Sequence, residues 1–156
     1  MLKIQLAQVK RRKELETKIS HLSLPGLLPA GQTLALNLET RTLSLLSDGP
    51  LLIMDQKFSL NEISVFVPIL ESFPNYCPYE VLLSHISSSV VTATSIARCR
   101  QRLQDAQNRG EWQQELRPVR RALSSLRNKL HYFGLEISNV RERGCSLTSL
   151  RSPLLE

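Results

Sequence analysis

Hydrophobic residues near the start of the chain recur at helical spacing. Apolar side chains occupy one face of residues 2–22, and the basic run Lys10–Lys13 lies between their two halves. The apolar positions are Leu2, Leu6, Val9, Ile19 and Leu22. This pattern predicts a basic amphipathic helix over residues 1–24, for which packing is the preferred role and nucleic-acid binding the alternative. The prolines and glycines of residues 25–31 then break the chain and mark the start of a domain.

Apolar and polar residues alternate in the next segment. In the run TLALNLE, at residues 33–39, every second residue is leucine, which is the two-residue period of a half-buried strand. The runs TLSLLS and PLLIMD continue the pattern at residues 42–47 and 50–55, and Asp48-Gly49 between them is typical of a hairpin turn. We expect a small antiparallel sheet of three strands.

A helical period returns at residue 59. Ser59 is followed three residues later by Glu62, the spacing of a capping box at the start of a helix. Pro68 lacks a backbone donor and should kink this helix. The residues expected to enter the core are Ile63, Phe66, Val67 and Leu70. A turn over residues 73–78 and a second helix over residues 79–86 should follow.

Two further helices and a hairpin are predicted in the second half of the chain. The helix over residues 94–108 is rich in arginine and glutamine, and Trp112 beyond it should anchor this segment to the core. The helix over residues 118–132 has a proline in its first turn, where proline is well tolerated. The hairpin has strands at residues 135–140 and 145–147, with its turn at residues 141–143.

The helix over residues 118–132 has one apolar face and one basic, polar face. Its apolar stripe consists of Val119, Leu123, Leu126 and Leu130. The other faces carry Arg117, Arg120, Arg121, Ser124, Arg127 and Asn128. Arginine can bind a guanine edge with two parallel hydrogen bonds, asparagine can do so with adenine, and arginine and serine also bind phosphates. A recognition helix for nucleic acid is one interpretation, and an ordinary surface helix is the other.

The charge distribution favours a nucleic-acid partner. The formal net charge is +6, with basic residues concentrated in residues 1–22 and 98–143 and a mildly acidic segment between them. Clustered positive charge is what phosphate neutralisation requires. Aromatic residues make up 5% of the chain, so stacking of bases on exposed rings is not expected to dominate.

No pattern in the chain predicts an enzyme. The three cysteines are widely spaced and the histidines are scattered, so neither a disulfide framework nor a metal site is expected. Glycine-rich phosphate loops and catalytic serine motifs do not occur. We expect no cofactor and free thiols in a reducing cytoplasm. There is no signal peptide and no apolar run of roughly 20 residues, so no membrane association is expected.

The C-terminal part of the chain resembles the OmpR/PhoB-type effector domain of bacterial response regulators. That family ends in V-x-x-x-[IL]-x-x-L-R-x-[KAR]-L, a turn and I-x-[TN]-V-[RW]-G-x-G-Y-x-[LF]. Here residues 119–130 read VRRALSSLRNKL and residues 137–147 read ISNVRERGCSL. Residues 60–70 and 79–82 are similar to two upstream helices of the family. The chain departs from the pattern at Glu142 and Cys145, where the family has glycine and an aromatic residue, and in an enlarged segment before the last helix.

The resemblance implies an α+β fold, a winged helix-turn-helix with an N-terminal antiparallel sheet, a C-terminal hairpin wing and an extra N-terminal helix. The domain would span residues 25–148, with residues 93–112 as an inserted helix and residues 149–156 as a tail. The implied function is that of a bacterial transcription regulator, with the last helix in the major groove and Arg141 in the minor groove of duplex DNA. Together with the polar face of the last helix and the charged hairpin tip, the resemblance gives the predicted DNA-binding residues Arg117, Arg120, Arg121, Ser124, Arg127, Asn128, Asn139, Arg141 and Arg143.

Other partners and one other function remain open. A homodimer is expected because such domains usually read paired half-sites. The segment over residues 87–116 could contact RNA polymerase or another protein, or could bind DNA through Arg98, Arg100, Arg102 and Arg109. The main alternative is a protein–protein adaptor, since a fold does not fix function. The adaptor interpretation would be favoured if the inserted helix lay across the last helix. Structured RNA is a third ligand that the same charge allows.

Overall fold

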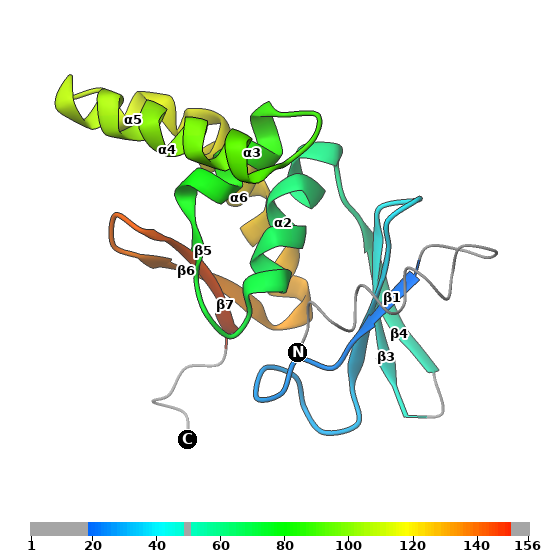
Figure 1. Cartoon of the computed structure of the whole chain (residues 1–156). Helices are drawn as coiled ribbons and strands as arrows, with labels where there is room; N and C mark the ends of the chain where they lie inside the picture. The colour runs from blue at the N-terminus through cyan, green and yellow to red at the C-terminus, as the bar shows by residue number, and fades with distance from the viewer. Residues whose placement is uncertain (1–18, 49–50, 151–156) are drawn as a thin grey trace.

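The fold is a mixed α+β arrangement that a computed structural model describes for residues 19–48 and 51–150. These residues form a four-stranded antiparallel sheet, a smaller three-stranded sheet and five α-helices. In Figure 1 the four-stranded sheet lies on one side of the central helices, and the C-terminal hairpin lies on the other side. None of the described helices combines the length and the apolar character needed to cross a bilayer.

The four-stranded sheet follows the order of the chain. Its strands are β1 (Ile19–Leu22), β2 (Thr33–Asn37), β3 (Thr42–Ser47) and β4 (Leu51–Lys57), each antiparallel to the next. Leu34 pairs with Leu45, and Leu36 pairs with Leu43. All four side chains are buried, as the alternating pattern predicts for one face of a sheet. Strands β1 and β4 form the two edges of the sheet. Strand β4 begins with three exposed apolar residues, Leu51, Leu52 and Ile53.

The prediction of a helix up to residue 24 is wrong at its C-terminal end. Residues 19–22 form β1, and Leu22 pairs with Leu34 of β2. Ser20 and Leu22 are buried, whereas His21 is exposed. Because Ile19 and Leu22 are three residues apart, they also satisfied a helical period. Leu24 is buried in the same core, so this segment belongs to the domain, and the sheet has four strands rather than three. The rest of the predicted helix lies outside the described residues.

Helix α2 (Leu60–Ser72) begins at the predicted capping box. The backbone N–H of Glu62 donates to Ser59 Oγ at 3.2 Å, and the backbone N–H of Ser59 donates to Glu62 Oε1 at 2.7 Å. The helix continues through Pro68 to its end. Its buried face includes Phe66, whose ring stacks on Phe58 at a centroid distance of 6.0 Å, and this contact joins the helix to the residue after β4.

The enlarged segment folds as two helices that pack on α3. Helix α3 spans Tyr79–Ser87, and the two helices of the enlarged segment are α4 (Ala93–Asn108) and α5 (Trp112–Glu115). The hydroxyl groups of Ser84 and Ser95 are buried and share a hydrogen bond of 2.8 Å between α3 and α4. Trp112 packs edge-on against Tyr79 with 5.4 Å between ring centroids. This contact confirms the prediction that the tryptophan anchors the segment.

The last helix and the hairpin complete the domain. Helix α6 (Arg117–Leu130) is followed by a single 3₁₀ turn, His131–Phe133, where the sequence predicted a continuous helix to residue 132. The three-stranded sheet has the order β5 (Cys77–Pro78), β7 (Gly144–Ser149) and β6 (Leu135–Val140). A Cβ atom at Gly144 would lie 1.9 Å from the carbonyl oxygen of Cys77, so only glycine lets β5 approach β7. Ser149 belongs to β7, and residues 151–156 of the predicted tail lie outside the described residues.

Candidate nucleic-acid interface

Helix α6 has the two faces that its sequence predicts. Val119, Leu123, Leu126 and Leu130 are all buried, as is Ala122. The opposite side is exposed and consists of Arg117, Arg120, Arg121, Ser124, Ser125 and Asn128. The burial of the apolar stripe fixes the rotation of the helix, so this exposed side, here called the basic face, is turned away from the core.

The basic face of α6 borders a shallow hollow of about 370 Å³. Its lining contains three arginines and a serine from α6, namely Arg117, Arg120, Arg121 and Ser124, and two glutamines from α5, Gln113 and Gln114. Each guanidinium offers five N–H donors in a planar fork, and no carboxylate lines the hollow. A surface of this kind can bind phosphate groups and base edges.

A second hollow of about 220 Å³ separates α6 from the hairpin. It is lined by Tyr79, Arg120, Leu123, Ser124, Arg127 and Asn139. Burial raises the pKa of Tyr79 to about 12. The other polar side chains of this hollow are those of Arg120, Ser124, Arg127 and Asn139, and the sequence assigned Asn139 to phosphate binding.

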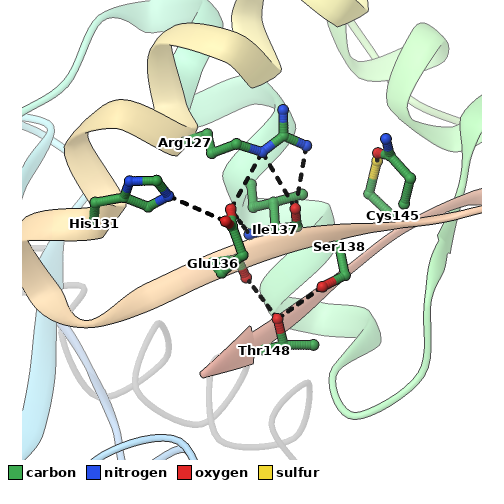
Figure 2. A network of polar contacts seen from close by, with 8 residues as sticks. Arg127, His131, Glu136, Ile137, Ser138, Cys145 and Thr148 are labelled. Carbon is green, nitrogen blue, oxygen red and sulfur yellow. Dashed lines mark hydrogen bonds and ion pairs between the residues drawn. The ribbon is translucent and has the colours of Figure 1, made fainter. Parts of the chain in front are cut away.

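Arg127 is turned toward the hairpin rather than toward solvent (Figure 2). Its Nε and Nη2 atoms both donate to the carbonyl oxygen of Ile137, at 3.2 and 3.1 Å. Its Nε also lies 3.3 Å from a carboxylate oxygen of Glu136, and His131 contacts the other oxygen of that carboxylate at 3.2 Å. The predicted DNA contact is therefore already engaged within the chain, and in this arrangement Arg127 joins α6 to β6.

The turn of the hairpin presents charged side chains to solvent. Arg141, Glu142 and Arg143 are all exposed. Glu142 adopts a left-handed conformation with φ of 59°, at the position where the OmpR/PhoB-type sequence pattern has a glycine. The carbonyl oxygen of Arg143 accepts a hydrogen bond of 2.9 Å from the backbone N–H of Tyr79, which holds the base of the turn against α3.

Four arginines at the basic face and the hairpin turn have free guanidinium groups. Within the described residues, the side chains of Arg117, Arg121, Arg141 and Arg143 make no hydrogen bond or ion pair. Arg120 differs, because its Nη1 donates to Oε1 of Gln113 at 2.6 Å. The face predicted from the sequence is thus exposed and cationic, apart from Arg127.

Most arginines of the enlarged segment are paired with carboxylates. Arg100 lies 3.1 Å from Glu80, and Arg109 lies 2.9 Å from Glu111. Arg102 donates through Nε to Glu115 at 2.9 Å. These arginines belong to α4 and its C-terminal end, which pack on α3 and α5. Arg98 is exposed and lies outside these pairs.

An ion pair between the partly exposed Lys129 of α6 and the buried Glu62 of α2 was not predicted. Lys129 Nζ lies 2.8 Å from Glu62 Oε1, donates to the carbonyl oxygen of Lys57 at 2.9 Å and lies 5.3 Å from the centre of the Phe58 ring. Burial alone raises the pKa of Glu62, but hydrogen bonds from Lys129 and from the Ser59 backbone outweigh it, and the pKa is lowered. The capping box identified Glu62 in the sequence, but a partner 67 residues away left no local signal.

Neither metal binding nor thiol chemistry is supported by the described residues. Among them no group of three or more histidine, cysteine or acidic side chains could hold a metal ion. The three cysteines are free and buried. Burial raises the pKa of Cys77 to about 12, which suppresses the nucleophilic thiolate.

Comparison of the chain with protein-family models, with curated proteins and with solved structures gave no match. The assignment of a function therefore depends on the geometry described above.

Proposed function

We propose that this chain binds duplex DNA as a winged helix-turn-helix transcription regulator. In this proposal α6 enters the major groove, the β6–β7 hairpin is the wing, and Arg141 reaches the adjacent minor groove. The order of elements supports it, because a four-stranded sheet, α2, β5, α3, α6 and a hairpin follow one another in the way the OmpR/PhoB-type resemblance implies. The inserted helices α4 and α5 come between α3 and α6.

The observation that carries the proposal is that α6 and the hairpin turn each expose unpaired arginines. Arg117 and Arg121 on the helix and Arg141 and Arg143 at the turn are exposed and free of internal partners within the described residues. Phosphate neutralisation requires such free cations, since each contact releases condensed counterions. Arg127 is not counted among the DNA contacts in this proposal.

The position of α4 favours DNA binding over the adaptor alternative. An adaptor would be favoured if the inserted helix covered α6. Instead α4 packs mainly on α3 and α5, and the residues of the basic face of α6 are exposed. Structured RNA remains a ligand of similar charge, but the deep, narrow major groove of an RNA duplex does not admit side chains in this way.

A titration of the full chain with a fluorescent DNA duplex, followed by anisotropy, tests the proposal. We expect binding that weakens steeply as sodium chloride is raised, and weaker competition by an RNA duplex than by an unlabelled DNA duplex. An absence of binding, or an affinity that does not change with salt, would contradict the proposal. Preferred competition by the RNA duplex would favour an RNA-binding function instead.

The proposal extends to two copies of the chain on one DNA site. Winged helix-turn-helix proteins commonly bind half-sites about one helical turn apart. Measuring the stoichiometry on a duplex that carries two such half-sites tests this extension. One chain per duplex at saturation would remove the dimer from the proposal and leave DNA binding unaffected.

A further inference from the structure

The side chains of Gln113 and Arg120 meet at the junction between α5 and α6. The Nη1 atom of Arg120 donates to Oε1 of Gln113 at a distance of 2.6 Å. Both residues are exposed, and both line the hollow on the basic face of α6. The contact therefore belongs to the surface that the proposed function places against DNA.

Helix α5 is held in place on both sides although it is short. Trp112 at its start packs against Tyr79 of α3. Leu116, the residue between α5 and α6, is fully buried. The backbone N–H of Leu116 donates to the carbonyl oxygen of Trp112 at 3.2 Å. Gln113 is thus presented by an anchored segment, which is a requirement for holding another side chain in a defined position.

The partner of Arg120 is neutral, in contrast to the partners of other arginines nearby. Arg102 and Arg109 face carboxylates, which cancel their charge. The amide of Gln113 orients Arg120 without cancelling its charge. The Nε and Nη2 atoms of Arg120 make no hydrogen bond within the described residues. Their N–H groups form a parallel pair that matches the N7 and O6 acceptors of guanine.

We infer that Gln113 is a positioning residue that orients Arg120 to read one guanine in the major groove. This inference rests on the proposed DNA-binding function. It gives the inserted segment a role in sequence specificity, through an amide rather than through its own arginines. An arginine oriented before binding loses less side-chain freedom when it contacts a base. Loss of Gln113 therefore weakens one base-specific contact and leaves the phosphate contacts in place.

Selection of preferred duplexes from a random library by the full chain tests this inference. The variants are Gln113→Ala and Arg120→Ala, and the matched control is Gln101→Ala, which removes an exposed glutamine that bonds to Asp105 on α4 and lies outside the lining of the hollow. The wild type and the control should select the same motif with guanine at one position. In Gln113→Ala and Arg120→Ala the preference for guanine at that position should fall roughly 5- to 50-fold. The affinity of these two variants for duplexes lacking that guanine should stay within about twofold of the wild type.

Three results would overturn the inference and leave DNA binding intact. They are an unchanged guanine preference in Gln113→Ala, an equal loss of affinity for every duplex in that variant, and binding by the wild type without any selected motif. A double variant with less preference than Arg120→Ala alone would also overturn it, because a positioning residue acts only through its partner. Failure of the wild type to bind any duplex would overturn both the inference and the proposed function.

Discussion

The inserted helices and α6 are both rich in arginine, but they use it differently. In the insertion, Arg100, Arg102 and Arg109 each contact a carboxylate. On α6, Arg117 and Arg121 are exposed and have no partner among the described residues. The number of arginines in a segment therefore does not identify a binding surface. What distinguishes the two segments is the position of the carboxylates nearest to their arginines.

The carboxylates that pair with the arginines of α4 and its C-terminal end all lie outside α4. Glu80 belongs to α3, and Glu115 belongs to α5. Exposed ion pairs of this kind add little to stability, but they reduce the local positive potential that a phosphate would encounter. The first turn of α6 contains no acidic residue. Most of the arginines of α4 are thus neutralised by carboxylates, whereas α6 keeps the unpaired cations Arg117 and Arg121.

The largest effect is expected from removing the unpaired arginines of α6. The double variant Arg117→Ala/Arg121→Ala should weaken binding to a DNA duplex by roughly 10- to 100-fold, because two phosphate contacts are lost. The matched double variant Arg102→Ala/Arg109→Ala should change the affinity by less than about twofold, since those arginines are paired. Anisotropy titrations at one salt concentration measure both. Equal losses of affinity in the two double variants would show that paired and unpaired arginines contribute alike to DNA binding, which would contradict the distinction between the two segments.

A substitution of Lys129 tests whether its ion pair with Glu62 holds α6 in place. Lys129→Ala leaves the Glu62 carboxylate buried without its partner and should lower the free energy of unfolding by about 1.5 kcal/mol, less than for a fully buried pair because Lys129 is partly exposed. Urea unfolding measures the change. In a background with Glu62→Gln, the same lysine substitution should cost much less. A similar loss of unfolding free energy in both backgrounds would show that the ion pair between Lys129 and Glu62 is not the cause of the destabilisation.

A substitution of Arg127 tests whether this arginine stabilises the fold, in contrast to the unpaired arginines Arg117 and Arg121 of the same helix. Arg127→Ala should lower the free energy of unfolding by about 1 kcal/mol, because two hydrogen bonds to the Ile137 carbonyl are lost. Arg127→Lys should not restore the loss, since an ammonium cannot reproduce the planar fork. If Arg127→Ala instead weakens DNA binding as strongly as the Arg117/Arg121 variant with unchanged stability, the residue contacts DNA.

The smallest effect is expected at the hairpin turn. Glu142→Gly should raise the free energy of unfolding by about 0.5 kcal/mol, because glycine adopts the left-handed conformation of this residue without steric cost. Glu142→Ala keeps the steric cost and removes the carboxylate. A gain in Glu142→Ala equal to that in Glu142→Gly would point to the charge of Glu142 rather than to backbone strain.

Much of the fold followed from local patterns, and the failures have identifiable causes. The capping box at Ser59, the apolar stripe of α6 and the hairpin after it were predicted because each depends on residues close in sequence. Strand β1 was missed because Ile19 and Leu22, three residues apart, satisfy a helical period, whereas in the strand Leu22 shares its buried face with the polar residue Ser20. Only pairing with β2, a tertiary interaction, decides between helix and strand.

The candidate site was predicted less completely than the fold. The sequence identified the exposed face of α6, because amphipathicity determines which side is buried. It could not show that Arg127 is bound to Ile137, since that contact depends on how the hairpin folds back on the helix. Gln113 also carried no signal, because a helix of four residues is too short to show a period.

The salt dependence of DNA binding tests the central claim most directly. The slope of log Kobs against log sodium chloride concentration should be measured for the wild type, Arg117→Ala/Arg121→Ala and Arg102→Ala/Arg109→Ala. Each phosphate contact contributes about 0.9 to the slope. The account predicts a slope shallower by nearly two units in the α6 variant and an unchanged slope in the insertion variant. A slope that changes only in the insertion variant, or in neither variant, would contradict it.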